Sequence, residues 1–258
     1  MKNIVCIGGG TGMPRVLESL KSHPVHLSAI VTMADDGGSA GVLRDEYGGL
    51  PPGDVRRVLV ALSDAEPTLK DLFLYRFSEG SLKDHTVGNI MLKALELKEG
   101  SFLKAIDEAK KVLQVQGDVI PVTLDSVRLC AEFEDGTLVR GEKKINSGEF
   151  VSKRVRRIWL EPKAQANPEA LRAISEADTI VIGPGGFYYS LVPNLLVEGI
   201  VDAMNSSKAK KVYIENLTPQ IQDFDYVNEI KKYIAVDMVL PSAIQSDPTK
   251  LSHVLLAL

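Results

Sequence analysis

Three loops rich in glycine or aspartate each follow a short apolar run, at residues 8–12, 34–39 and 183–186. Glycine lets a ligand approach the backbone closely, and the start of a following helix presents free N–H groups to an anion. The carboxyl ends of parallel strands lie along one edge of an open α/β sheet, where ligands bind. Together the three loops predict one site for a phosphorylated nucleotide ligand.

The first loop lacks the spacing of a dinucleotide fingerprint, because Met13 stands where G-x-G-x-x-G needs its last glycine. No Gly-Lys-Ser/Thr follows, so a Walker A loop is excluded as well. The alternative interpretation is a tight turn between a strand and a helix. Because the other loops converge with it, we expect phosphate or ribose contacts from this loop and from the third one, at Gly9, Gly10, Thr11, Gly12, Gly183 and Gly185.

The second loop places two carboxylates beside glycines, in Asp35-Asp36-Gly37. One aspartate at the end of the second strand of such a fold can hold a ribose hydroxyl. The adjacent carboxylates also allow a hard cation such as magnesium, for which Asp36 is the candidate ligand. A solvated Asp-Gly turn is the structural alternative.

Two further motifs add candidates. Asp54 is expected to cap a helix, whereas Arg56 and Arg57 would lie in its first turn, where the helix dipole disfavours cations. A bound anion would offset that cost, and a solvent-facing pair is the alternative. His85 and Asn89 are four residues apart in an expected helix over 84–97, so they would share one face.

The third loop leads into Tyr188 and Tyr189, which could flank a base or sugar or cover the core. A helix is expected over about 191–205, with Ser190 as its cap. Asn216 and Thr218 follow the next strand and are expected on the same edge of the sheet.

Alternating strands and helices must position these residues. Buried strands are expected at 4–7, 27–33, 179–182, 211–215 and 236–240, with amphipathic helices between them. The stretch 34–54 is interpreted as a binding loop of about 20 residues. Residues 118–124, 127–134 and 137–145 are β-rich, with a hairpin turn at Asp135-Gly136, and predict a small antiparallel excursion. We therefore predict a single, doubly wound α/β domain over 1–258, with a mostly parallel sheet and a β-rich insert at about 117–160.

Composition narrows the function classes. The formal charge of −4 and the pI near 5.7 argue against a nucleic-acid-binding surface. No apolar run approaches the roughly 18 residues of a membrane span, and the first strand leaves no room for a signal peptide. Cys6 and Cys130 both sit in apolar runs, which favours reduced, buried thiols. We expect a cytoplasmic protein without nucleic-acid or membrane partners.

In order along the chain, these motifs resemble those of the bacterial gluconeogenesis factors (YvcK-like proteins), which are related to phospholactate transferases (CofD-like). The resemblance covers about 1–240 and implies a Rossmann-like fold, a nucleotide-diphosphate ligand of the UDP-sugar type, and a role in growth on gluconeogenic carbon sources and in cell-wall or shape control. It rests on residues 8–12, 32–39, 51–54, 85, 88–89, 129–132, 183–185 and 193–196.

The chain departs from the family pattern at several positions. Gly186 stands where Ser is usual, Tyr189 where Thr is common, and Arg57 where Asn is frequent. A familiar Gly-Glu-Thr stretch after Gln220 is missing, which puts contacts from that region in doubt.

The leading hypothesis is a regulatory protein that binds a UDP-sugar without turnover and requires no cofactor. The alternatives are a magnesium-dependent transferase of the phospholactate transferase type and an NAD-binding oxidoreductase. The oxidoreductase is disfavoured by the missing fingerprint, although NAD remains a candidate ligand. A homo-oligomer is compatible with all of these.

Overall fold

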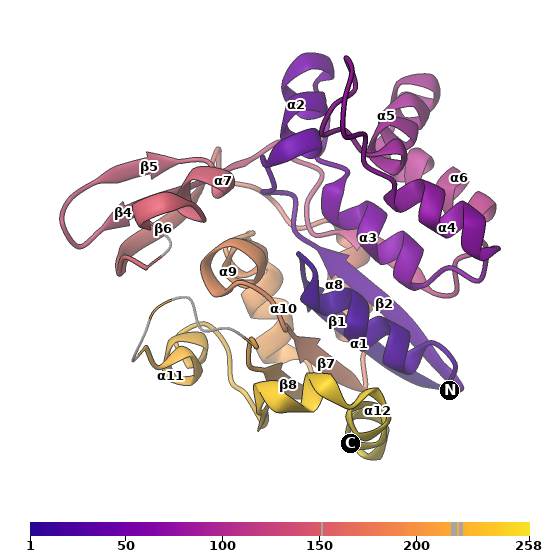
Figure 1. Ribbon diagram of the computed structural model, residues 1–258. Helices are drawn as coiled ribbons and strands as arrows, with labels where there is room; N and C mark the ends of the chain where they lie inside the picture. The colour runs from indigo at the N-terminus through magenta and orange to yellow at the C-terminus, as the bar shows by residue number, and fades with distance from the viewer. Residues whose placement is uncertain (151, 218–220, 222–223) are drawn as a thin grey trace.

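The computed structural model describes residues 1–150, 152–217, 221 and 224–258. Its main sheet has six strands that pair in parallel in the order β3-β2-β1-β7-β8-β9 (Figure 1). The order reverses between β1 and β7, as in the Rossmann arrangement. The bounds are β1 Lys2–Gly8, β2 Val25–Val31, β3 Asp118–Pro121, β7 Thr179–Ile182, β8 Lys210–Ile214 and β9 Met238–Leu240.

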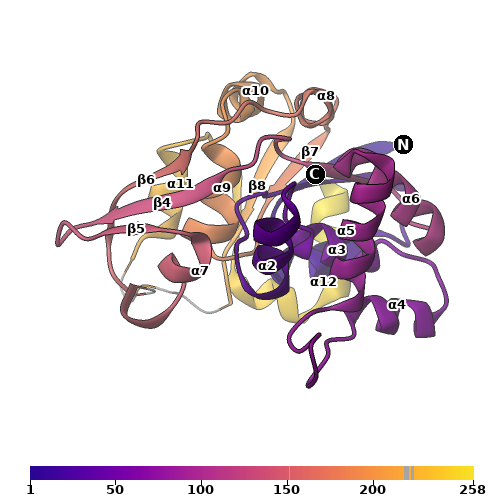
Figure 2. The ribbon, with the colours of Figure 1, turned by 90° about the horizontal axis from the view of Figure 1, so that it is seen from above.

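Helices cover both faces of this sheet, because the strand side chains alternate between two buried clusters. Ile4 and Cys6 of β1 pack into one cluster, whereas Val5 and Ile7 pack into the other. The first face carries α1 Gly12–Leu20, α3 Gly53–Ala61, α6 Phe102–Leu113 and α12 Pro248–Ala257. The second carries α8 Pro168–Ser175, α9 Val192–Leu195, α10 Ile200–Ser206 and α11 Tyr226–Lys231 (Figure 2). The predicted doubly wound, mostly parallel fold is confirmed.

A second sheet of three antiparallel strands extends to one side of the main sheet (Figures 1 and 2). Its order is β5-β4-β6, and its bounds are β4 Arg128–Phe133, β5 Leu138–Arg140 and β6 Val155–Glu161. Asp135-Gly136 forms the expected turn, where Gly136 has a φ of +82°. The insert is smaller than expected: β3 pairs with β2 in the parallel sheet, because its apolar residues are buried there.

The stretch expected to continue β5 turns into a helix instead. Gly141 has a φ of +111°, which ends the strand, and α7 Glu142–Ile145 follows directly. The short helix η1 Gly148–Phe150 then completes the connection to β6.

Three more expectations are corrected. The predicted long loop contains α2 Gly38–Tyr47, which is anchored by buried Leu43 and Arg44. Helix α5 Val87–Glu99 begins later than expected, after α4 Pro67–Leu74 and a hairpin-like segment that pairs Phe77 with His85. The helix expected over 191–205 is split into a π turn at Phe187–Leu191, α9 and α10, because Gly199 adopts a φ of +97°.

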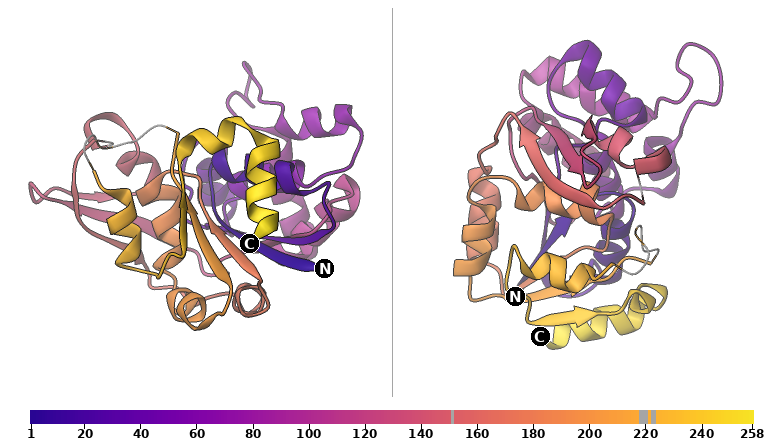
Figure 3. Two further views of the ribbon diagram at one scale, coloured as in Figure 1. Left: turned by 90° about the horizontal axis from the view of Figure 1, so that it is seen from below. Right: turned by 90° about the vertical axis from the view of Figure 1, so that its left-hand side faces the viewer.

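Both ends of the described chain lie together at the edge of the sheet opposite the strand carboxyl ends (Figure 3). The Lys2 ammonium donates hydrogen bonds to the carbonyls of Leu255 and Leu256, near the end of α12.

Across the described part of the chain, the helices all lack the length and apolar character needed to cross a membrane. The final 3-10 helix, η3 Ser242–Ser246, returns the chain to the other side of the sheet.

Candidate ligand-binding site

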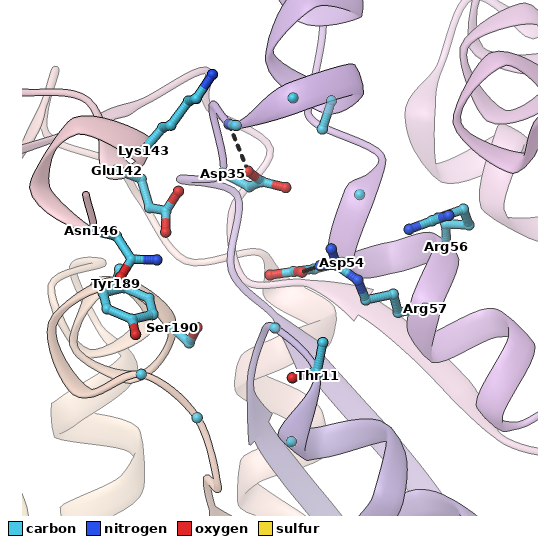
Figure 4. A pocket seen from close by; sticks show the side chains of 18 of the residues that line it. Thr11, Asp35, Asp54, Arg56, Arg57, Glu142, Lys143, Asn146, Tyr189 and Ser190 are labelled. Carbon is cyan, nitrogen blue, oxygen red and sulfur yellow. Dashed lines mark hydrogen bonds and ion pairs between the residues drawn. The ribbon is translucent and has the colours of Figure 1, made fainter. Parts of the chain in front are cut away.

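A cavity of about 650 Å³ lies where the carboxyl ends of the parallel strands meet the insert (Figure 4). The loops that follow β1, β2, β7 and β8 line it, together with the starts of α2 and α3, and with α7 across the opening. This is the position that the strand order predicts for a ligand.

Most of the sequence-predicted site residues line this cavity. They are Gly10, Thr11, Gly12, Asp35, Gly37, Asp54, Arg57, Asn89, Gly185 and Asn216. Those that do not are Gly9, Asp36, His85, Gly183 and Tyr188. Thr218 falls outside the described residues.

Glycines in the loops let the loops pack against one another. A Cβ on Gly12 would lie 2.4 Å from the carbonyl oxygen of Pro184, and a Cβ on Gly9 would lie 2.5 Å from Oδ2 of Asp54. Gly183 turns the chain with a φ of +81°. Glycine is therefore required at these positions by the packing of the loops as well as by any close approach of a ligand. The contacts hold the loops around one space.

Asn194 joins the first and third loops by hydrogen bonds. Its buried side-chain amide donates to the carbonyl of Gly8, at 3.2 Å, and to that of Ser190, at 2.8 Å. The Asn of the Pro193-Asn194 motif therefore acts on the backbone that frames the cavity.

Asp36 does not line the cavity and instead binds the insert. Its Oδ1 accepts a hydrogen bond from the backbone N–H of Lys143 at 2.8 Å, and its Oδ2 lies 3.2 Å from Nη1 of Arg128. Both carboxylate oxygens already have partners, so the residue that was predicted to hold ribose or magnesium joins the β2 loop to α7 and β4.

Its neighbour Asp35 lines the cavity instead. Oδ1 of Asp35 accepts from the backbone N–H of Gly37 at 2.8 Å, which shapes the turn before α2 (Figure 4). Gly53 makes room for this carboxyl, because a Cβ there would lie 2.5 Å from Oδ2.

The π turn after β7 decides which tyrosine faces the cavity. Ser190 and Leu191 both donate to the carbonyl of Gly186, which closes the wide turn. Tyr188 consequently packs edge-to-face on Phe187 in the core, with ring centroids 5.0 Å apart. Tyr189 and Ser190 line the cavity in its place. Ser190, expected to be a helix cap, lies inside the turn.

His85 and Asn89 do not share a helical face, because His85 precedes α5. Its Nδ1 lies 3.2 Å from the hydroxyl of Ser39. Asn89 lies in the first turn of α5 and is buried, and its Oδ1 has no hydrogen-bond partner within the described structure. A buried amide oxygen without a partner is costly, so Asn89 is placed to accept from a ligand.

Three helices begin at the cavity with uncapped ends. Thr11, Gly37 and Pro52 occupy the N-cap positions of α1, α2 and α3, and none of them makes a side-chain capping hydrogen bond. The expectation that Asp54 is the cap is wrong, since Gly53 already begins the helix and Asp54 lies in its first turn. Free N–H groups and the positive ends of three helix dipoles favour an anion here.

Four arginines stand on the α1 and α3 side of the cavity: Arg15, Arg56, Arg57 and Arg76. Nη1 of Arg57 binds Oδ1 of buried Asp54 at 2.5 Å. Arg56 is only 4% exposed, and its Nε has no partner within the described structure. Burial and the neighbouring arginines lower its pKa to about 10.

The side chain of Arg56 crosses Gly88, where a Cβ would lie 2.8 Å from its Cδ. Helix α5 thus leaves space at Gly88 for an arginine that the helix dipole of α3 disfavours. A buried guanidinium with a free donor is placed to bind an oxyanion.

Carboxyl groups line the opposite side, where the side chain of Glu142 points toward Asp35 (Figure 4). Burial, reinforced by the charge of Asp54, raises the pKa of Asp35 to about 6. Burial and then the charge of Asp35 raise the pKa of Glu142 to about 8, so this side chain is mostly protonated at pH 7. Within the described ranges, His, Cys, Asp and Glu side chains form no group of three that could hold a metal ion.

The lining residues that escaped the sequence interpretation include Arg15, Arg76, Glu142 and Asn146. Arg15 follows Thr11 by four residues, so the spacing along α1 places both on one face and could have identified it. The other three reach the cavity through long-range packing of the 75–86 segment and the insert, which local sequence patterns do not reveal.

Residues 4–252 match the family described as 2-phospho-L-lactate transferase CofD. The chain is 46% identical over 228 residues to the gluconeogenesis factor of Listeria innocua, covering 88% of this chain and 70% of the relative. It is 49% identical over 226 residues to the gluconeogenesis factor of Halalkalibacterium halodurans, covering 87% and 69%.

A solved structure agrees with this relationship. The crystal structure of a UPF0052 family member from Bacillus halodurans is similar with a TM-score of 0.88 and 45% identity, over 93% of this chain and 80% of that one. The family match spans most of the chain, and the similar proteins and the similar solved structure agree with it. The chain therefore belongs to the CofD family.

Proposed function

We propose that this protein binds a nucleotide-diphosphate sugar of the UDP-sugar type and acts as a regulator in growth on gluconeogenic carbon sources and in cell-wall or shape control. The observation that carries the binding proposal is the convergence of three uncapped helix starts and four arginines on one cavity. The regulatory role is inferred from relatives that bear the name gluconeogenesis factor.

The anionic part of the ligand fits the arginine side. Each helix start contributes about 0.3–1 kcal/mol to a bound anion, and each charge-assisted hydrogen bond about 1.5–3 kcal/mol. Three helix starts with two such bonds contribute about 4–9 kcal/mol, which reaches the roughly 8 kcal/mol of a micromolar complex only near the upper end of that range. Because binding also costs translational and side-chain entropy, contacts to the uncharged parts of the ligand are needed as well.

Thermal unfolding with UDP-N-acetylglucosamine, UDP-glucose, NAD and GTP, each with and without magnesium, tests the proposal. A ligand at 100 times its Kd stabilises by about 2.7 kcal/mol, a shift of roughly 5–10 °C for a chain of this size. Arg15→Gln should weaken the response, because Arg15 lines the cavity. Arg172→Gln is the matched control, because the Arg172 side chain is exposed on α8, outside the cavity. No shift with either UDP-sugar would refute the proposal.

A second candidate is favoured by the family match, whose description is a phospholactate transferase. Magnesium at Asp36 does not fit the geometry, because Arg128 and Lys143 already occupy that carboxylate. A transferase is recognised by product formation from a nucleotide-activated lactate and a deazaflavin acceptor. Turnover of this mixture would replace the regulatory proposal, whereas UDP-sugar binding without turnover supports it.

A further inference from the structure

Tyr189 and Gly186 occupy one space at the edge of the cavity. A Cβ on Gly186 would lie 1.8 Å from Cε2 and 2.2 Å from Cζ of the Tyr189 ring. Real Cβ atoms essentially never come within 3.0 Å of another group, so the ring can lie there only because residue 186 has no side chain. The two residues therefore form one structural feature.

The wide π turn delivers the ring to the cavity. Ser190 and Leu191 close this turn on the carbonyl of Gly186, so the residue that makes room for the ring also anchors the turn that presents it. The Tyr189 ring is half-buried and lies beside Asn146 and Ser190 (Figure 4). Burial and the nearby Glu142 raise the pKa of its hydroxyl to about 12, which keeps it neutral.

The surroundings of the ring are rich in hydrogen-bond acceptors. Asp35, Glu142 and Asn146 all line this side, and Glu142 begins α7 whereas Asn146 directly follows it. The four arginines lie on the other side. The ionised carboxyl of Asp35 disfavours a diphosphate on the Tyr189 side, which leaves this side for an uncharged group with many donors.

A sugar fits these requirements better than a pyrimidine base. Its several hydroxyls each donate a hydrogen bond, whereas uracil presents two carbonyl acceptors and a single N–H donor. The C–H face of a sugar ring can also pack on an aromatic face, as pockets use rings to orient ligands.

We propose that Tyr189, which fits because residue 186 is glycine, is a specificity-determining residue whose ring packs on the sugar of the nucleotide-diphosphate ligand, on the side of the cavity that Glu142 and Asn146 line. The inference rests on the proposed function and assigns the sugar end of that ligand. It also assigns the diphosphate to the arginine side.

Calorimetric titration of UDP-glucose and of UDP into five variants tests the assignment. Tyr189→Thr removes the ring and should weaken UDP-glucose binding by about five- to tenfold, while UDP binding changes less than about twofold. Tyr189→Phe keeps the ring and should recover most of the lost affinity. Tyr47→Thr, on an exposed tyrosine of α2, is the matched control and should bind both ligands like the unmodified protein.

Gly186→Ser gives an independent arm, because its Cβ must displace the ring. Alone it should cost about as much UDP-glucose affinity as Tyr189→Thr. The double variant Gly186→Ser/Tyr189→Thr should lose no more than either single variant, since both changes remove the same contact. Melting temperatures of the free variants establish that each one folds.

The outcomes separate the two proposals. Absence of binding of both UDP-glucose and UDP-N-acetylglucosamine to the unmodified protein overturns the proposed function. Normal binding that Tyr189→Thr leaves unchanged overturns only this inference, as does an equal loss for UDP and UDP-glucose, which would place the base on the ring. Fold-changes that multiply in the double variant would show that Gly186 and Tyr189 act separately.

Discussion

Glu142 provides a direct test of the electrostatics of the cavity. Its side chain faces Asp35, and burial together with that charge raises its pKa to about 8. Ionised Glu142 would add negative charge to a cavity that we propose to hold a diphosphate. Ligand binding should therefore select the protonated form and weaken as the pH rises above 8.

The magnitude follows from the protonated fraction. With a pKa of about 8, this fraction falls from about 0.9 at pH 7 to about 0.09 at pH 9, so the apparent Kd should rise about tenfold, equivalent to about 1.4 kcal/mol. Asp35, with a pKa of about 6, is already mostly ionised at pH 7 and contributes little to this change. Arg56, with a pKa of about 10, stays mostly protonated up to pH 9.

Isothermal titration of UDP-glucose at pH 7, 8 and 9 measures the effect. Glu142→Gln should make the Kd nearly independent of pH over this range, because the amide does not titrate. Glu169→Gln, on the exposed surface of α8, should retain the full dependence. A Kd of the unmodified protein that stays constant from pH 7 to 9 would refute the assignment of this titration to Glu142.

The same pKa shift affects stability. The unfolded chain releases the Glu142 proton near pH 4.5, whereas the folded chain keeps it to about pH 8. Because the folded state binds more protons in this window, the free energy of unfolding should fall as the pH rises through it. Urea unfolding at several pH values should show a smaller decrease for Glu142→Gln than for the unmodified protein.

Two further predictions concern the framework of the cavity. Gly12→Ala places a Cβ 2.4 Å from the Pro184 carbonyl oxygen and should reduce the free energy of unfolding by about 1–3 kcal/mol. Urea denaturation measures this against Gly8→Ala, whose nearest contact is an ordinary 3.4 Å, and equal losses would contradict the argument. Asn194→Ala removes a buried donor from the carbonyl of Ser190 and from that of Gly8, which keeps the Thr32 N–H, and the two lost bonds should together cost about 1–3 kcal/mol. Unchanged unfolding of this variant would show that the loops do not depend on it.

Much of the fold follows from local patterns in the sequence. Short apolar runs such as Thr179–Ile182 identify the buried strands, and Asn167 with Pro168 marks the start of α8 as expected, with Asn167 accepting from the N–H of Glu169. The errors occur where packing overrides local preference. Residues 38–47 contain two helix-disfavouring glycines, yet buried Leu43 and Arg44 hold them in α2.

The sequence predicts the position of the candidate site in the fold better than it predicts which side chains line it. The sheet edge follows from strand order, and it brings Thr11, Asp35 and Asn89 into the cavity. A local pattern cannot show which of two adjacent residues faces the cavity, because the direction of a side chain depends on the turn that carries it. The sequence favours Asp36 over Asp35 for the metal and Tyr188 over Tyr189 for the ligand, whereas Asp35 and Tyr189 line the cavity.

The bond between the Lys143 amide and Asp36 makes one hydrogen atom a reporter for the whole insert. At 2.8 Å this bond joins the start of α7 to the loop after β2. The insert cannot swing away from the sheet without breaking it, so exchange of this amide with solvent deuterium records each opening. A ligand held between the insert and the main sheet would slow that exchange. The exchange rate of the Lys143 amide therefore measures how often the cavity opens.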